Sequence, residues 1–289
     1  MNCCKLLLFV FLVSLSSCAK EDPWQKVFNG KNLEGWDTYI GPAFDSIKNA
    51  FDTTQVLGLN NDQNKIFTVV DEDGQPAIRI SGENFGGIST TKEFKNFHLQ
   101  LEFKWGRKKS NPRKDKKRDS GILYHAVGKH GADFGFWMRS QEFQVQEGDT
   151  GDYWGVAGGS FEVPVSQRGE GFVYNPDGEK LTFNEKSKVG RRAIKIPDAE
   201  KPTGEWNTIE IYCLGDTAVH TVNGQVTMML YHSSQLDNGN LKRLDQGKIQ
   251  IQSEGAEVFY RNIQLEKINT IPDKIIHHKY DPTWGMDFD

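Results

Sequence analysis

Short segments in which apolar and polar residues alternate recur along most of the chain. Such a period of two is typical of β-strands with one buried face, because successive side chains point to opposite sides of a sheet. The dipeptide Asn223-Gly224 separates two of these segments and is a strong hairpin signal. We predict an all-β fold, an antiparallel β-sandwich or jelly roll of the concanavalin A type. The segments are 77–81, 87–94, 97–104, 121–126, 141–147, 206–213, 217–222, 225–230, 248–253 and 258–267.

Helical periodicity is almost absent, and a short helix is expected only near 233–236. The 289 residues are 37% hydrophobic, which is enough for one large domain. We place this domain at 27–268 and a C-terminal extension, which wraps the domain or trails from it, at 269–289. Cys213 lies in an alternating segment and is expected to be a small buried residue without a catalytic role.

The N-terminus has the pattern of an export signal. Lys5 precedes an apolar run, 6–15, that is too short to span a membrane, and the sequence Leu15-Ser16-Ser17-Cys18 follows. This ending resembles a bacterial lipobox, and 19–22 resembles the export tag of Bacteroidetes surface lipoproteins. We predict a signal peptide at 1–17, lipidation of Cys18 and a short tether at 18–26. The protein would then be anchored to the outer membrane, on its periplasmic or cell-surface face. A plain signal peptide with an incidental cysteine is the alternative.

The charge distribution argues against nucleic acid as a partner. The formal net charge is −4, so the chain has no global basic field. One run, 107–121, holds eight basic residues between Arg107 and Arg118 against the single acid Asp115. No aromatic residues interleave with this run, as they would in a site that stacks nucleic-acid bases. We interpret it as a solvated hairpin loop.

Two alternating segments carry long amide and carboxylate side chains on their polar face. If the two strands belong to one curved sheet, these side chains line a common groove that can bind a sugar. An ordinary solvated outer face is the alternative for each strand taken alone. The polar positions are Glu142, Gln144, Gln146, Gln250 and Gln252.

Several motifs, taken in order, resemble the 3-keto-disaccharide hydrolase family over about 27–268. This resemblance implies a concanavalin-like jelly roll and cleavage of glycosides whose glucose carries a ketone at carbon 3. The motifs are FNGKNLEGW at 28–36, RDSGILYH at 118–125, EFQVQEGD at 142–149, GEWN at 204–207, QIQSEG at 250–255 and YRNI at 260–263.

A ketone at carbon 3 acidifies the hydrogen on carbon 2, so the glycosidic bond can break by elimination before water adds. This reaction needs a general base, a hydrogen-bond donor for the ketone oxygen and an acid for the leaving group. The resemblance implies that Glu142, Glu147 and His125 are catalytic, with either glutamate as the base. The four glutamines named above, Trp154 and Arg261 would bind the substrate.

Three alternatives remain open. A divalent cation could bind to Glu147, Asp149 and Asp152, which form an oxygen-rich turn. Glu142, Gln144 and Glu147 have nearly the spacing of the catalytic strand in retaining glucanases of this fold, with a glutamine at the central aspartate position. A surface sugar-binding protein without catalysis would need the amides and aromatics, but neither His125 nor the paired glutamates.

Overall fold

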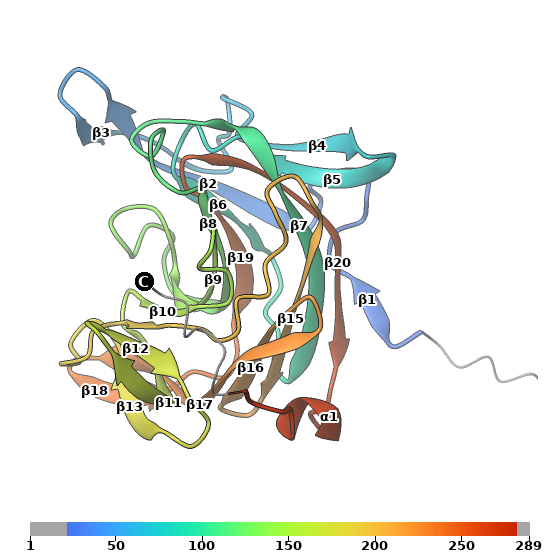
Figure 1. Cartoon of the computed structure of the whole chain (residues 1–289). Helices are drawn as coiled ribbons and strands as arrows, with labels where there is room; N and C mark the ends of the chain where they lie inside the picture. Colours follow the sequence, from blue (N-terminus) through green and yellow to red (C-terminus); the bar gives the residue numbers. More distant parts are fainter. Residues whose placement is uncertain (1–21, 282–289) are drawn as a thin grey trace, which may run out of the picture.

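The computed structural model describes residues 22–281, which form two facing antiparallel sheets (Figure 1). The eight-stranded sheet is, in spatial order, β14 (Arg192–Ala193), β10 (Tyr153–Val156), β9 (Arg139–Gln146), β8 (Asp119–Val127), β19 (Lys248–Ser253), β6 (Gly86–Thr90), β2 (Trp36–Asp45) and β3 (Ala50–Leu59). The twelve-stranded sheet has the order β12 (Gly171–Tyr174), β11 (Gly159–Arg168), β17 (Gln225–Asp237), β16 (Thr217–Val222), β15 (Asn207–Leu214), β7 (Phe97–Lys109), β20 (Ala256–Lys267), β5 (Gln75–Ile80) and β4 (Phe67–Glu72), with β1 (Trp24–Lys26) on β20, β13 (Glu179–Phe183) on β11 and β18 (Asn240–Arg243) on β17.

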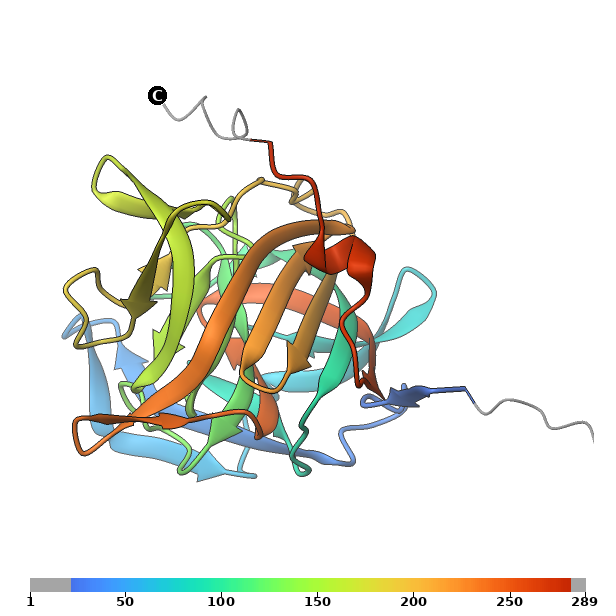
Figure 2. The ribbon, with the colours of Figure 1, turned by 90° about the horizontal axis from the view of Figure 1, so that it is seen from below.

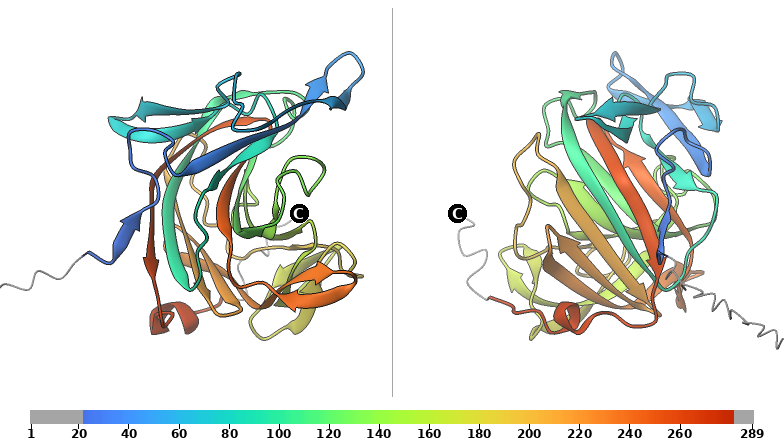
Figure 3. Two further views of the ribbon diagram at one scale, coloured as in Figure 1. Left: turned by 180° about the vertical axis from the view of Figure 1, so that it is seen from behind. Right: turned by 90° about the vertical axis from the view of Figure 1, so that its right-hand side faces the viewer.

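The main core lies between the two sheets. Leu99 and Leu101 of β7 are fully buried, and Ile122 of β8 and Phe143 of β9 meet them from the other sheet in one apolar cluster. Fully burying a side chain of this size contributes about 1.5–3 kcal/mol, so this cluster dominates the stability of the fold. The predicted antiparallel sandwich is confirmed. Figure 3 shows the two layers from behind and the strands of the larger sheet side by side.

Strands without strict alternation were not predicted. They are β1 to β4, β10 to β14 and β18, most of them short or at sheet edges. In β2 the residues Gly41 and Pro42 interrupt the pattern, and the pairing with β3 shifts register between Pro42 and Ala43. The bulge hides the period of two from sequence analysis because it turns the following side chains to a new side.

The expected helix at 233–236 is wrong. This segment belongs to β17, which pairs there with β11 and β18 after a bulge at His232, whose φ is +57°. The single helix in residues 22–281 is α1 (Asp273–Ile276), where Ile275 is buried. Figure 2 shows α1 beside the strands β15–β17. The described part of the C-terminal extension therefore wraps the domain.

Cys213 is buried and unpaired, as predicted. Between residues 22 and 281 no helix has both the length and the apolar character needed to cross a membrane. The predicted signal peptide, Cys18, the first part of the tether and residues 282–289 lie outside the described residues.

The hairpin that joins β16 and β17 gives a test of the fold. Asn223 has a φ of +50°, and its side chain bonds Thr208 N (2.9 Å), Ala199 O (2.8 Å) and Asn207 Oδ1 (2.8 Å). Alanine loses these bonds, each contributing about 0.5–1.5 kcal/mol, and adds about 1 kcal/mol of backbone strain. We expect Asn223→Ala to lower the free energy of unfolding by about 3 kcal/mol, measured by urea denaturation.

Asn238→Ala is the matched control. Asn238 precedes Gly239 in the β17–β18 hairpin with the same φ of +50°, but it is exposed. It makes no side-chain hydrogen bond among those of the described residues, so its substitution isolates the strain and should cost about 1 kcal/mol. Equal losses for the two variants would contradict the role assigned to the Asn223 side chain.

Candidate active site

The amide and carboxylate side chains of β9 and β19 lie on one face of the eight-stranded sheet, with β8 between them. Gly121 of β8 pairs with Gln144, and Ile122 pairs with Ile251, which places Gln252 on the other side of Gly121. These side chains are nearly inaccessible: Gln144 is 6% exposed and Gln252 is 1% exposed. The structure therefore brings the residues of the two strands together, on a face that is buried rather than solvated.

Gly121 allows Glu142 and Gln252 to meet above β8. A Cβ atom at this position would overlap the carboxylate of Glu142 and the amide of Gln252. The Gln252 side chain hydrogen-bonds the carboxylate of Glu142, which is 6% exposed. Any larger residue at 121 would separate the two side chains.

Asp119 is a buried carboxylate in this face that sequence analysis missed. It begins β8 opposite Gln146 and is 3% exposed. It accepts hydrogen bonds from Gln144 Nε2 (2.9 Å) and from Gln146 Nε2, and it forms an ion pair with Arg113. Burial raises the pKa of Asp119 to about 7, although the charge of Arg113 opposes this rise.

Arg113 and Glu254 complete the charged part of the site. Arg113 Nη1 lies 3.3 Å from Glu254 Oε1, just after β19. Burial, followed by the nearby charge of Asp119, raises the pKa of Glu254 well above its usual range. Gly255 has a φ of +82°, and a Cβ there would lie 2.8 Å from the Arg113 Cβ. The interpretation of 107–121 as a merely solvated loop is therefore wrong at Arg113.

We call Asp119, Glu142 and Glu254 the carboxylate cluster. Burial raises the pKa of Glu142 well above its usual range, and the charge of Asp119 adds to the rise, while Arg191 opposes it. The cluster thus contains three carboxyl groups whose pKa values are raised by burial, that of Asp119 to about 7. Such groups can donate and accept protons near neutral pH, which is the property that general acid–base catalysis needs.

Trp154 stands beside Glu142, because the two residues pair across β10 and β9. Its indole is partly exposed. The guanidinium groups of Arg191 and Arg192 lie 5.4 and 5.7 Å from the ring centre. The predicted aromatic residue thus borders the carboxylate cluster.

Gln250 has a different position from that expected of a free sugar-binding side chain. It is fully buried, and its Oε1 accepts a hydrogen bond from Met138 N (2.9 Å). Met138 belongs to the loop before β9. In the same loop Trp137 Nε1 donates to Gly86 O (2.9 Å), and Trp137 packs in a second apolar cluster that includes Leu123. Gln250 therefore holds the loop before β9 over the face. Its Nε2 has no partner among the described residues.

The expected pairing of Glu142 with Glu147 is wrong. Glu147 lies in the turn after β9, where its carboxylate contacts Arg118 Nη1 (2.6 Å) and Thr203 Oγ1 (2.7 Å). Burial alone would raise the pKa of Glu147, but bonds from the Arg118 backbone, Thr203 and the Arg118 side chain lower it. Glu142 has Asp119 and Glu254 as its carboxyl neighbours instead. The glucanase-like pair, which the same spacing left open as an alternative, is not formed either.

His125 and Arg261 also lie away from the carboxylate cluster. A bulge in β8 gives His125 a φ of +51°, and its ring packs against Phe97, with ring centres 5.7 Å apart. Burial lowers the pKa of His125 to about 4, so the ring is neutral. Arg261 belongs to the other sheet, where it bonds Glu102 (2.5 Å) and lies 3.7 Å from the Trp206 ring centre. The expectation that these two residues join Glu142 is wrong.

The predicted cation ligands are each engaged by a basic side chain. Over residues 22–281, no group of three or more His, Cys, Asp or Glu side chains is arranged to hold a metal ion. The contacts are Glu147 with Arg118 (2.6 Å), Asp149 with Lys117 (3.0 Å) and Asp152 with Arg192 (2.6 Å).

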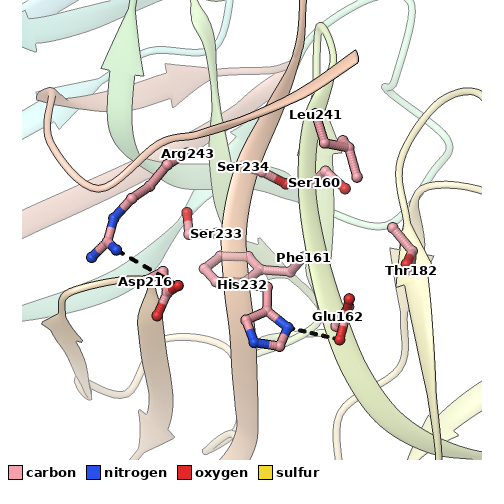
Figure 4. Close-up of a pocket in the computed structure, with 10 residues that line it drawn as sticks. All are labelled: Ser160, Phe161, Glu162, Thr182, Asp216, His232, Ser233, Ser234, Leu241 and Arg243. Carbon is pink, nitrogen blue, oxygen red and sulfur yellow. Dashed lines mark hydrogen bonds and ion pairs between the residues drawn. The ribbon is translucent and has the colours of Figure 1, made fainter. Parts of the chain in front are cut away.

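A separate pocket of about 220 Å³ lies between β11, β17 and β18 (Figure 4). His232 Nδ1 lies 2.8 Å from Glu162, and Arg243 lies 3.9 Å from Asp216 at its edge. Leu241 lines this pocket and is 52% exposed. None of its lining residues belongs to the carboxylate cluster, so the two sites are distinct.

Comparison with known proteins identifies the family. Residues 23–266 match the model of the 3-keto-alpha-glucoside-1,2-lyase-like domain. The chain belongs to this family. Membership supports a carbohydrate-active function and a sugar as partner. No curated protein matches the chain.

Solved structures are similar at low sequence identity. A Parabacteroides distasonis protein, described provisionally as a glycosyl hydrolase, is 18% identical, with 85% of this chain and 99% of that chain covered and a TM-score of 0.46. Carbohydrate binding module CBM66 from Bacillus subtilis is 9% identical, with coverages of 69% and 91% and a TM-score of 0.40. LamAcat from Zobellia galactanivorans is 11% identical, with coverages of 80% and 90% and a TM-score of 0.40.

The raised pKa of Glu142 makes a prediction about stability. Above the ordinary glutamate pKa of about 4.3, the unfolded chain loses this proton while the folded chain keeps it. Folding stability therefore falls as pH rises from about 4 to the folded pKa, by about 1.4 kcal/mol for each unit of elevation. Glutamine cannot ionise. We expect Glu142→Gln to gain stability relative to wild type between pH 4 and pH 8, measured by urea denaturation.

Glu147→Gln is a control of opposite sign. The pKa of Glu147 is lowered, so its carboxylate stabilises the fold above the ordinary pKa and loses this effect as pH falls. This variant should lose stability at neutral pH, with a difference that shrinks toward pH 3. A Glu142→Gln difference that stays flat from pH 4 to pH 8 would show that Glu142 ionises normally.

Proposed function

We propose that the protein cleaves the glycosidic bond of 3-keto-glucosides by elimination across carbons 1 and 2, followed by hydration. The observation that carries this proposal is the buried carboxyl of Glu142. It has a raised pKa, a bonded amide in Gln252 and two further carboxyls nearby. The family described as 3-keto-alpha-glucoside-1,2-lyase-like supports the choice of substrate.

The reaction balances without an oxidant or reductant. A carboxylate takes the proton on carbon 2, and the electrons of that C–H bond form a double bond between carbons 1 and 2. The bond from carbon 1 to the leaving oxygen breaks, and this oxygen keeps the electron pair and takes a proton. Water then adds across the double bond and gives the free 3-keto sugar.

The carboxylate cluster supplies both proton-transfer roles. The pKa of Asp119 is about 7, so its carboxyl exchanges protons near neutral pH, and burial favours the protonated form of Glu142. Glu142, beside Trp154 and Arg191, gives its proton to the leaving oxygen. An ionised member of the cluster receives the proton from carbon 2. Positioned acid–base catalysis of this kind contributes about 10²–10⁴-fold in rate.

The glutamines divide into two sets in this proposal. The amides of Gln144 and Gln146 bond Asp119 and fix its position. Gln252 Oε1 and Gln250 Nε2 have no partner among the described residues, although both are buried. Because an unpaired buried polar atom is costly, Gln252 Oε1 beside Glu142 is suited to accept a hydrogen bond from a sugar hydroxyl, whereas Gln250 stays with the loop at Met138.

The test compares a 3-keto-glucoside with its unoxidised parent. We expect wild-type protein to consume only the oxidised sugar, and Glu142→Gln to lower kcat by about 10²–10⁴-fold. Glu147→Gln is the matched control, because it makes the same change at a glutamate ion-paired to Arg118. In deuterated water, elimination places deuterium on carbon 2 of the product beyond the exchange seen without protein.

Other outcomes would contradict the proposal. Equal cleavage of both sugars would indicate a glucanase-like enzyme, and retention of both without product would indicate a sugar-binding protein. A loss of activity in Glu147→Gln but not in Glu142→Gln would move the reaction away from the carboxylate cluster.

We also infer export and anchoring of the chain through a lipid on Cys18. The apolar run at 6–15 and the following Leu15-Ser16-Ser17-Cys18 support this. Lipidation provides the membrane contact in this inference, because each CH₂ group of an acyl chain buried in the bilayer contributes about 0.8 kcal/mol. When cells are fractionated, we expect the Cys18→Ser variant in the soluble fraction and the wild-type protein in the membrane pellet. Continued pelleting of the variant would contradict the anchor.

A further inference from the structure

A hollow of about 390 Å³ lies next to Glu142 and has no role in the proposed proton transfers. It is built from three segments: β10, residues 170–172 at the start of β12, and residues 189–194, which include β14. We call it the Trp154 hollow. Its lining side chains are those of Trp154, Phe172, Val189, Ile194, Arg191, Arg192 and Glu170, with the backbone of Gly171 and Gly190.

The lining of this hollow is unlike that of the carboxylate cluster. Four of its side chains are apolar or aromatic and only partly buried: Trp154, Phe172, Val189 and Ile194. No amide or hydroxyl side chain contributes to it. Gly171 lets the Ile194 side chain approach, because a Cβ at 171 would lie 2.6 Å from Ile194 Cδ1. The surface thus offers apolar contact and few sites for the hydroxyl groups of a sugar.

The two arginines of the hollow already have partners. Arg192 contacts Asp152 (2.6 Å) and Asp149 (3.3 Å). Arg191 contacts Asp133 (3.3 Å), and its guanidinium lies between Phe134 and Trp154, 5.5 and 5.4 Å from the two ring centres. Both guanidinium groups therefore lie within cation–π distance of the Trp154 ring, and their ion pairs hold them at the edge of the hollow.

Two residues connect the hollow to the carboxylate cluster. Trp154 pairs with Glu142 across β10 and β9. The charge of Arg191 acts on the Glu142 carboxyl and opposes the rise of its pKa. A substrate whose glycosidic oxygen lies at Glu142 would therefore direct the group beyond that oxygen toward Trp154 and Arg191.

We propose that the Trp154 hollow binds the leaving group of the substrate and that this group is an aromatic aglycone rather than a second sugar. The proposal rests on the proposed function for the position of the glycosidic oxygen. A cavity of about 150 Å³ can hold one benzene ring, so the hollow has room for a single-ring aglycone. Arg191 also lies where negative charge develops on a departing phenolic oxygen, which it stabilises.

The first experiment measures binding without turnover. Phenyl and methyl glucosides of both anomers, unoxidised and therefore not cleaved, are titrated into the full chain by calorimetry. We expect the phenyl glucoside of one anomer to bind at least tenfold more tightly than its methyl counterpart. Ile194→Ala and Phe172→Ala should each reduce this preference severalfold, because each removes apolar surface from the hollow.

Leu241→Ala is the matched control. Leu241 is an exposed apolar residue of the separate pocket between β11, β17 and β18 shown in Figure 4. It does not line the Trp154 hollow. This variant should keep the full preference for phenyl. Using two variants of the hollow guards against the failure of either one to fold, which circular dichroism would reveal.

The second experiment measures turnover of phenyl and methyl 3-keto-glucosides. Phenol is a better leaving group than methanol, so the wild-type ratio alone does not report binding. We expect Ile194→Ala to lower kcat/KM about tenfold more on the phenyl substrate than on the methyl substrate, mainly through KM. A disaccharide substrate should respond like the methyl one.

The outcomes separate the two proposals. If no 3-keto-glucoside is cleaved but phenyl glucosides bind through Ile194 and Phe172, the proposed function fails and the aromatic site stands. If 3-keto-glucosides are cleaved but phenyl and methyl glucosides bind equally, the aglycone proposal is overturned. Equal losses on both substrates in the hollow variants would also overturn it.

Discussion

The eight-stranded sheet buries carboxylate and amide side chains on the face that points away from the main core, and this constraint determines the arrangement of the site. A buried carboxylate or amide is costly unless it has a hydrogen-bond or ion-pair partner. Asp119 meets this requirement through Gln144, Gln146 and Arg113 at once. The positions of β8, β9 and the loop that carries Arg113 are therefore fixed relative to one another by one carboxylate.

Glu142 differs from Asp119 because no cation bonds it directly. Its bonded neighbour is the neutral amide of Gln252, while the guanidinium of Arg113 goes to Asp119 and Glu254. Three carboxyls thus share one directly bound cation, and burial makes full ionisation of all three unfavourable. Such sites titrate as a group, so the proton moves within the cluster rather than belonging permanently to one residue. That behaviour suits a reaction in which one proton is taken and another is given.

Much of the fold and part of the site could be predicted from the sequence. Strict alternation located β9 and β19 and assigned Glu142, Gln144 and Gln252 to one face, because the period of two is a local property of the chain. The predicted positions of His125 and Glu147 were wrong because alternation does not show where a strand bulges or ends. A bulge turns His125 toward Phe97, and β9 ends at Gln146, so Glu147 enters a turn.

The remaining residues of the site depend on tertiary contacts that no local pattern encodes. Arg261 alternates correctly, but its strand belongs to the other sheet. Arg113 is one of eight basic residues in a run, and its ion pairs with Asp119 and Glu254 and its packing against Gly255 are visible only in the folded chain. Asp119 carried one available signal, since it lies two positions before the alternating segment 121–126 and therefore on the same face as Gly121.

The site also opposes the stability of the fold that contains it. A carboxyl that stays protonated when buried weakens folding at neutral pH, because the unfolded chain would release that proton to water. The apolar cluster between the sheets has to offset this loss, and it reaches the site directly: Phe143 and Val145 point into the core from the strand that carries Glu142 and Gln144. One strand therefore supplies both the stabilising and the destabilising side chains. The core fixes the backbone of β9, so only the side chain of Glu142 is left free to move. Gly121 has no side chain, and this leaves the space in which the Glu142 side chain meets Gln252.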